Sequence, residues 1–370
     1  MSALFTPIQL RGLKLPNRIM VAPMCQYSSV DGDANDWHFT HINSLALSGA
    51  GVFCIEATAV EASDRITPSC LGLYSDSNEA ALKPILASVR KRSRAAVMIQ
   101  LAHAGRKASS HTPWDGGQLI PVTEGGWRAE GPSAIPHKEG ETPPQAFDAA
   151  GLIRVREAFV MAAKRAERLG IDAIEVHSAH GYLLHQFLSP ISNQRTDQYG
   201  GSLENRMRFP LEVFDGVRAA FPHDKPVGLR LSSTDWVEGG WDLAQTIEYA
   251  RELKKRGVDW IDASSGGVSP LQKIPLGPGY QVPFAAAIKQ AVGVTTIAVG
   301  LITEARQAEE IVASGKADMV ALARGMLYDP RWGWHAAAEL GGEVFAPQQY
   351  WRSQPSTQKA LFGATTFGTR

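Results

Sequence analysis

The stretch Glu175-Val-His-Ser-Ala-His-Gly-Tyr182 is the part of this sequence from which its fold and function are best argued. The apolar run 171–176 predicts a short strand, and Leu169-Gly170 before it is a typical helix ending. Two histidines and a tyrosine therefore follow at the point where a strand gives way to a loop. Catalytic groups gather at such points in α/β folds, and all three side chains can donate a hydrogen bond to an oxygen.

Two plainer interpretations of these histidines compete with a catalytic one. A single buried histidine usually serves packing, and His-x-x-His is also a weak metal-site pattern. No third ligand stands at a recognisable spacing from His177 and His180, so we expect no metal site here.

The composition indicates a protein that acts on small molecules. The chain has 370 residues, 44% of them hydrophobic, which suits one large α/β barrel with insertions or two ordinary domains. Lys plus Arg and Asp plus Glu number 37 each, so no surface for nucleic acid or an anionic membrane is indicated. The sequence shows no leader peptide, no membrane-spanning run and no Cys-x-x-Cys, and we expect a cytoplasmic protein.

Strands and helices alternate along the chain. The expected strands are 18–24, 52–57, 95–101, 171–177, 226–232, 258–264, 295–299 and 318–322. The expected helices are 36–47, 78–92, 148–169, 205–221, 242–256, 285–292, 303–314 and 325–340, the last with a bend near Asp329-Pro330. Because the strands are too apolar to be half-exposed and no Gly-x-Gly-x-x-Gly opens the first helix, the pattern favours a closed (β/α)8 TIM barrel over an open doubly wound sheet. Residues 1–370 would then form one α/β domain.

Two segments stand outside this alternation. Residues 102–147 are rich in Gly, Pro, His and Trp without a clear period, and a loop of this length favours a binding lid over a passive insertion. Residues 341–370 belong to no repeat unit, and we expect this tail to cover a neighbouring surface, at a subunit interface.

In a barrel, the residues after each strand meet at one end and should share one chemistry. Gly300 and Ala323-Arg324, after the last two strands, lie where barrels often bind phosphate. Arg230, inside an apolar strand, needs either a buried carboxylate or an anionic ligand, and Gln100 suits the edge of a heteroaromatic ring. These features together indicate a phosphorylated flavin beneath a substrate.

Six stretches spread over the chain carry a resemblance. They are Ala22-Pro-Met-Cys-Gln-Tyr27, Glu56-Ala-Thr-Ala-Val60, Gln100-Leu-Ala-His-Ala-Gly-Arg-Lys107, His177-Ser-Ala-His-Gly-Tyr-Leu183, Asn193-Gln-Arg-Thr-Asp-Gln-Tyr-Gly-Gly-Ser202 with Glu204-Asn-Arg206, and Arg324 with Asp329-Pro330. Through them the sequence resembles the old yellow enzyme family of flavin-dependent ene-reductases, in particular its thermophilic-like branch, and is similar to xenobiotic reductases.

The resemblance implies an FMN held at the barrel mouth. The implied cofactor-binding residues are Ala22, Pro23, Met24, Cys25, Ala57, Gln100, Arg230, Val299, Gly300, Ala323 and Arg324. Cys25 would adjust the redox behaviour of the flavin, and Arg230 would stabilise the negative charge of its reduced form. The last four residues would take the phosphate. The sequence departs from the family at Ala323, where glycine is common, which should matter little for a contact made by backbone N–H.

The implied reaction is ping-pong. NADPH or NADH passes a hydride to the flavin and leaves, and an enone, enal, maleimide or nitroalkene then binds in the same space. His177 and His180 would bind the substrate oxygen, the β carbon would accept hydride, Tyr182 would protonate the α carbon, and Tyr27 would position the substrate.

The branch also implies a homodimer or homotetramer. In it the tail contributes a residue to the partner's site, which by position suggests Trp351 or Arg352 as a further substrate-binding residue. A tail that packs on its own barrel is the alternative.

Three other functions remain open at this point. One is a dienoyl-CoA-reductase-like flavoenzyme on the same barrel, although such enzymes carry an added cysteine cluster and a second nucleotide domain that this sequence lacks. The others are a flavin-binding protein without turnover and a zinc-dependent hydrolase.

Overall fold

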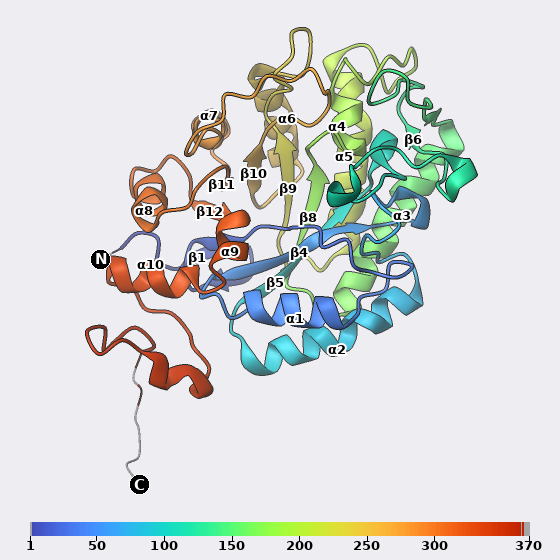
Figure 1. Ribbon diagram of the computed structural model, residues 1–370. Helices are drawn as coiled ribbons and strands as arrows, with labels where there is room; N and C mark the ends of the chain where they lie inside the picture. Colours follow the sequence, from blue (N-terminus) through green and yellow to red (C-terminus); the bar gives the residue numbers. More distant parts are fainter. Residues whose placement is uncertain (1, 364, 366–370) are drawn as a thin grey trace.

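The protein is a closed barrel of parallel strands surrounded by helices (Figure 1). The computed structural model describes residues 2–363 and 365. The barrel strands are β3 (Ile19–Val21), β4 (Val52–Ala59), β5 (Ala96–Ala102), β8 (Ala173–Ser178), β9 (Val227–Ser232), β10 (Ile261–Ser264), β11 (Thr296–Ala298) and β12 (Met319–Leu322). They pair in that order, and β12 pairs with β3 to close the ring. The predicted TIM barrel is confirmed, with all eight expected strands present.

Helices between the strands form the outer layer. They are α1 (Asp36–Leu45), α2 (Asp76–Arg92), α3 (Ala149–Arg168), α5 (Leu203–Ala220), α6 (Leu243–Lys255), α7 (Val282–Val292), α8 (Ala305–Ala313) and α10 (Trp332–Leu340). Side-chain caps set several starts, as at α3, where the Asp148 carboxylate accepts the Gly151 N–H at 2.7 Å. The inward faces are apolar: Phe159 of α3 and Phe214 of α5 are fully buried.

The bend expected near Asp329-Pro330 is present. The helix expected over 325–340 is divided there into α9 (Arg324–Tyr328) and α10, because the residue before a proline is disfavoured in helical geometry. The short helix α4 (Leu183–Leu188) was not predicted. It is buried on all sides, so its sequence carries no amphipathic period.

An unpredicted hairpin closes the lower, N-terminal end of the barrel. Its strands are β1 (Ile8–Leu10) and β2 (Leu13–Leu15), each too short to give a clear alternation in the sequence. Leu10 and Leu15 pack in one apolar cluster with Trp260, which enters the barrel. Gly228 makes room for that indole, since a Cβ on Gly228 would lie 2.0 Å from the Trp260 ring.

The segment 102–147 runs over the opposite, C-terminal end of the strands. It includes β6 (Glu130–Gly131), whose label marks its place in Figure 1. It has little regular structure: three short 3-10 turns, η2 (Gly105–Lys107), η3 (Pro113–Asp115) and η4 (Val122–Glu124), and the pair β6 and β7 (Gln145–Ala146). Arg195 holds it down by donating hydrogen bonds to the Pro132 carbonyl at 2.9 Å and the Phe147 carbonyl at 2.8 Å.

The described part of the tail packs near the other end. Val344 and Phe362 pack against α10, and the Arg94 guanidinium lies 4.7 Å from the Phe345 ring. Arg94 directly precedes β5, so this contact belongs to the lower end of the barrel. In Figure 1 the tail extends from that side, away from the mouth. Residues 364 and 366–370 of the expected tail lie outside the described part of the chain.

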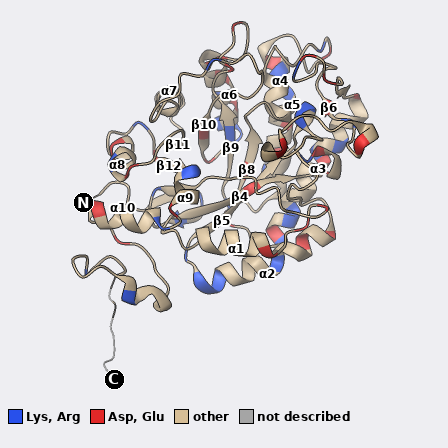
Figure 2. Ribbon diagram, viewed as in Figure 1, with Lys and Arg blue, Asp and Glu red and all other residues tan. Residues whose placement is uncertain are grey.

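Charged residues of both signs lie on the outer helices. Figure 2 shows acidic and basic residues interspersed over the outer helices, in agreement with the equal counts in the sequence. Among the described residues no helix combines the length and apolar character that a membrane span requires.

Candidate active site

The loop after β8 forms one wall of the barrel mouth. His177 is the second-last residue of β8, and the rings of His180 and Tyr182 each lie 5.1 Å from the His177 ring, centroid to centroid. His180 adopts a left-handed backbone with φ of 58°, which its side chain does not favour. The next residue, Gly181, packs closely against the backbone of Gly267. A Cβ at position 181 would lie 2.0 Å from the Gly267 carbonyl oxygen, so only glycine fits there.

The two imidazoles are neutral hydrogen-bonding groups. Burial, and then the charge of Arg230, holds the pKa of both His177 and His180 well below its ordinary value. His180 Nε2 lies 2.6 Å from the Ser264 hydroxyl, and His180 Nδ1 lies 3.4 Å from His177 Nε2. His177 Nδ1 is buried and has no partner among the described residues. It is therefore open to a ligand.

Tyr182 lies beside a half-buried lysine. Lys107 Nζ is 4.7 Å from the centre of the Tyr182 ring and donates hydrogen bonds to the carbonyls of His180, at 2.8 Å, and Gly267, at 3.2 Å. Burial raises the pKa of the Tyr182 phenol well above its usual value. The phenol is thus protonated at neutral pH.

A network of buried polar side chains fills the barrel below the histidines. Gln100 donates to one Glu175 oxygen at 2.8 Å, and the Trp260 indole donates to the other at 3.3 Å. Arg230 Nε lies 3.3 Å from an Asp262 oxygen. The sequence left open whether Arg230 pairs with a carboxylate or serves a ligand, and the structure supplies the carboxylate. Burial raises the pKa of Asp262, and it raises that of Glu175 to about 7.

The segment Ala22–Tyr27 forms a second wall of the mouth. Its course is fixed by the buried Glu56, whose side chain accepts the Gln26 N–H at 2.9 Å. Burial raises the pKa of the Cys25 thiol well above its ordinary value, so the group is a neutral thiol rather than a thiolate. Tyr27 has a φ of 50° and touches Trp114 of the segment 102–147 edge to face, with ring centres 5.6 Å apart.

The ends of β11 and β12 provide features that suit a phosphate. Gly300, next to Val299, has a φ of 114°, and a Cβ there would lie 2.8 Å from Gln281 Nε2. Ala323 precedes α9, and Arg324 is exposed at its start. Arg324 has no carboxylate within 4 Å among the described residues. Its charge is therefore available to an anion.

Several site residues escaped the sequence analysis. Lys107 stands in one of the motifs that carry the resemblance, but the motif assigns it no role, and Ser264 is only the last residue of the expected strand 258–264. A third feature is His185 with Asp235, two fully buried groups 2.8 Å apart, where His185 Nδ1 also accepts the Gly181 N–H. Nothing in the sequence links His185 with Asp235, because they lie on different strand–helix units.

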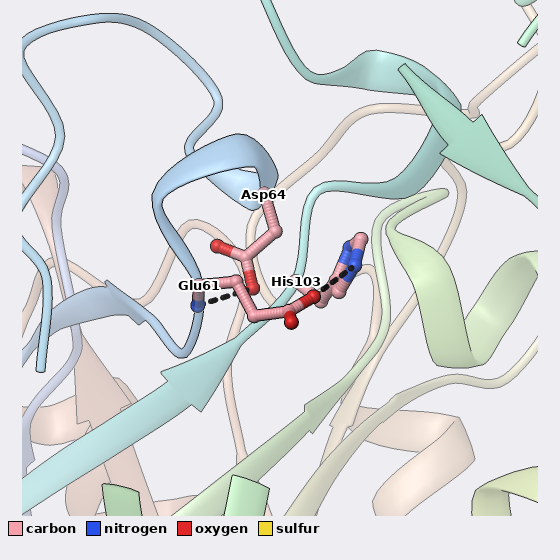
Figure 3. A group of neighbouring side chains, drawn as sticks. All are labelled: Glu61, Asp64 and His103. Atoms are coloured by element: carbon pink, nitrogen blue, oxygen red, sulfur yellow. Dashed lines mark hydrogen bonds and ion pairs between the residues drawn. The ribbon is translucent and has the colours of Figure 1, made fainter. Parts of the chain in front are cut away.

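Three ligand-type side chains meet at the rim of the mouth: Glu61, Asp64 and His103 (Figure 3). His103 Nδ1 accepts the Gly105 N–H at 2.9 Å, so the proton of the neutral ring is on Nε2, which lies 4.0 Å from a Glu61 oxygen. A metal ion on Nε2 would have to displace this proton while Nδ1 remains an acceptor, which would leave the ring as an imidazolate anion. The cluster is therefore better described as a donor facing two carboxyl groups.

The structure does not bring Trp351 and Arg352 to the mouth of their own barrel. Trp351 packs with the cluster around Trp334 and donates to the Ala346 carbonyl at 3.0 Å. Arg352 is exposed. Their expected role in a partner's site stays a prediction.

The comparisons with known proteins point to one family of enzymes. The model of the NADH:flavin oxidoreductase / NADH oxidase family matches residues 3–342. An NADH:flavin oxidoreductase of Gibberella zeae is 45% identical over 358 residues, covering 92% of this chain and 86% of that protein. The NADPH dehydrogenases of Geobacillus sp. WCH70 and Bacillus subtilis are 44% and 41% identical over 351 residues, covering 94% of this chain and 98% of each relative.

Solved structures show the same fold. Morphinone reductase superposes with a TM-score of 0.77 at 30% identity, over 93% of this chain and 91% of that one. A 2-naphthoyl-CoA reductase gives a TM-score of 0.82 at 24% identity, which shows the fold alone, and this chain spans only 55% of that protein.

These matches confirm the resemblance found in the sequence, the assignment as an oxidoreductase, and FMN with a nicotinamide nucleotide as cofactors. The chain belongs to the NADH:flavin oxidoreductase / NADH oxidase family, the family of the old yellow enzymes.

Proposed function

We propose that the protein is an FMN-dependent ene-reductase that uses NADPH or NADH to reduce enones, enals, maleimides and nitroalkenes. The observation that carries this proposal is the neutral imidazole pair beside a protonated phenol at the barrel mouth. Such a set can polarise an oxygen and deliver a proton without placing a charge against the substrate.

The chain's own residues suit FMN. Ala22, Pro23, Met24, Cys25 and Ala57 would line its ring, Gln100 and Arg230 would contact its polar edge, and Val299, Gly300, Ala323 and Arg324 would hold its phosphate. The unpaired Arg324 and the glycine required at position 300 support the phosphate assignment. Arg230 Nε makes no hydrogen bond of good geometry, which supports a further partner for that side chain. Bound FMN supplies a ring that accepts hydride from the nicotinamide and gives it to an electron-poor carbon.

One arrangement of protons satisfies the imidazole pair. If the Ser264 hydroxyl donates to His180 Nε2, then His180 Nδ1–H donates to His177 Nε2, and the N–H of His177 Nδ1 is left for the substrate oxygen. His177 would then bind the carbonyl or nitro group, and His180 would strengthen that donor. Direct contact of His180 with the same oxygen remains a further expectation of the family resemblance.

Tyr182 is proposed to protonate the α carbon. Its high pKa keeps the proton in place until the carbon becomes basic. A cavity of about 190 Å³ lies between Tyr27, Tyr182 and the segment 102–147, which supports the roles of Tyr27 in positioning substrate and of the segment as a lid. We also propose a cytoplasmic homodimer or homotetramer in which Trp351 or Arg352 reaches the partner's site.

Anaerobic reoxidation of the reduced holoenzyme tests this function. A panel of small enones, maleimides and nitroalkenes should reoxidise the flavin, whereas saturated analogues should not. Tyr182→Phe keeps the ring beside His177 and Lys107 but removes the proton, and should slow enone reduction by about 10²–10⁴-fold. A holoenzyme that no activated alkene reoxidises would contradict the proposal and leave a flavin carrier.

A further inference from the structure

The cavity between the mouth and the segment 102–147 has an unusual charge balance. Three cationic side chains line it, Arg106, Lys107 and Lys138, against a single carboxylate, Glu141. The cavity is continuous with the proposed reaction site, because Tyr27 and Tyr182 form part of the same lining.

Two of these cations, the buried Arg106 and the half-buried Lys107, have no counter-ion among the described residues. Arg106 is 5% exposed, and neither Arg106 nor Lys107 has a carboxylate within 4 Å in the described part of the chain. Arg106 donates to the carbonyls of Ile135, Pro136 and Val268, while its Nε has no partner. Carbonyl dipoles solvate such a charge but leave it uncompensated.

Lys107 also retains hydrogen-bonding capacity. Its ammonium has three N–H groups, of which two donate to the carbonyls of His180 and Gly267. Burial, followed by the neighbouring charges of Arg106 and Lys138, lowers the pKa of Lys107 to about 8. The like charges that lower this pKa are those that an anion in the cavity would offset.

We propose that this cavity is a binding site for an anionic oxygen group, a carboxylate or phosphate, carried by a ligand that enters the mouth. The proposal rests on the function proposed above and adds a ligand class to it. Two sources share this chemistry: an electron-poor alkene with a carboxylate side chain, and a phosphate of the nicotinamide nucleotide.

The test measures binding with probes that differ only in charge. Calorimetric titration of the holoenzyme compares 6-oxoheptanoate with its methyl ester, whose ketone can still approach His177. The charge-reversing variant Lys138→Glu should weaken binding of the carboxylate by at least about threefold at low ionic strength and leave the ester unchanged. The Glu141→Gln variant should strengthen carboxylate binding, since glutamine keeps the acceptor for the Lys138 N–H while removing the negative charge.

A matched control and a second arm make the outcome decisive. Lys83→Glu makes the same change of net charge on the exposed face of α2, away from the cavity, and should leave the carboxylate-to-ester ratio at the wild-type value. The second arm titrates NADPH and NADH. If Lys138→Glu weakens binding of the carboxylate probe, the site is assigned to the substrate. If it weakens binding of the nucleotides alone, the site is assigned to their phosphates. Unchanged affinities in both arms would overturn the proposal.

Failure of this inference can be told apart from failure of the proposed function. The enone (E)-6-oxohept-4-enoate and its methyl ester are used as substrates in parallel. If both are reduced equally well by the wild type and by Lys138→Glu, with unchanged affinities, the reductase function stands and the anion site falls. If neither is reduced although 6-oxoheptanoate binds in a charge-dependent way, the anion site stands and the reductase function falls.

Discussion

The two ends of this barrel are built from different chemistry. At the lower end, Leu10 and Leu15 of the hairpin, Met20 and Trp260 form an apolar plug in which every side chain is at most 2% exposed. Near the mouth, the barrel strands carry buried amides, carboxyls, a guanidinium and imidazoles, and His180 and Tyr27 hold unfavourable backbone geometry. Stability is therefore concentrated at the lower end, whereas the mouth contains strained backbone and buried polar groups.

The largest effect expected from this comparison is on stability. Leu15→Ala should lower the free energy of unfolding by about 2–5 kcal/mol, because it leaves a cavity in the plug. The flavin of the folded fraction should still be reduced and reoxidised at the wild-type rate. Urea unfolding, together with stopped-flow kinetics below the transition, measures both quantities. A Leu15→Ala variant with wild-type stability and slower turnover would contradict the assignment of stability to the lower end and of activity to the mouth.

A smaller effect concerns the pH dependence of stability at the mouth. Burial lowers the pKa of His103 to about 3, below the ordinary 6.5 that it regains on unfolding. The contribution of neutral His103 to the free energy of unfolding is therefore complete above pH 6.5. It is lost as the pH falls toward 3, because the unfolded chain takes up the proton first. In His103→Asn, the side-chain oxygen can still accept the Gly105 N–H. Between pH 6.5 and 5, the unfolding free energy of this variant should fall by about 1–2 kcal/mol less than that of the wild type.

The control for this measurement is at the lower end. Leu15→Ala changes no titratable group, so its unfolding free energy should run parallel to that of the wild type over the same pH range. If the difference in unfolding free energy between the wild type and His103→Asn is constant between pH 6.5 and 5, His103 has an ordinary pKa in the folded protein and the prediction is wrong.

The architecture could be predicted from the sequence because it rests on local signals. Apolar strands alternating with amphipathic helices define the barrel, and polar groups after strands define its mouth. The hairpin and α4 were missed since three-residue strands and a fully buried helix carry no period. At the site, His177, His180 and Tyr182 are close in sequence and were found together.

The remaining site features depend on contacts across the barrel. Asp262 as the partner of Arg230, and Lys107 over Tyr182, bring together residues from different strand–helix units. No pattern along one segment encodes such a pairing. The same holds for the cavity cations, whose missing counter-ions become visible only when the segment 102–147 is placed over the mouth.

The most direct test of the account follows one half of the reaction in His177→Ala. The holoenzyme is reduced with dithionite and mixed anaerobically with 2-cyclohexenone, with His41→Ala, a histidine packed against Phe53 at α1, as the matched control. We expect His177→Ala to retain FMN, but its reduced flavin should be reoxidised at least about 10²-fold more slowly than that of the wild type. The flavin of His41→Ala should be reoxidised at the wild-type rate. Reoxidation of His177→Ala at the wild-type rate, with FMN bound, would contradict the assignment of the imidazole pair as the group that activates the alkene.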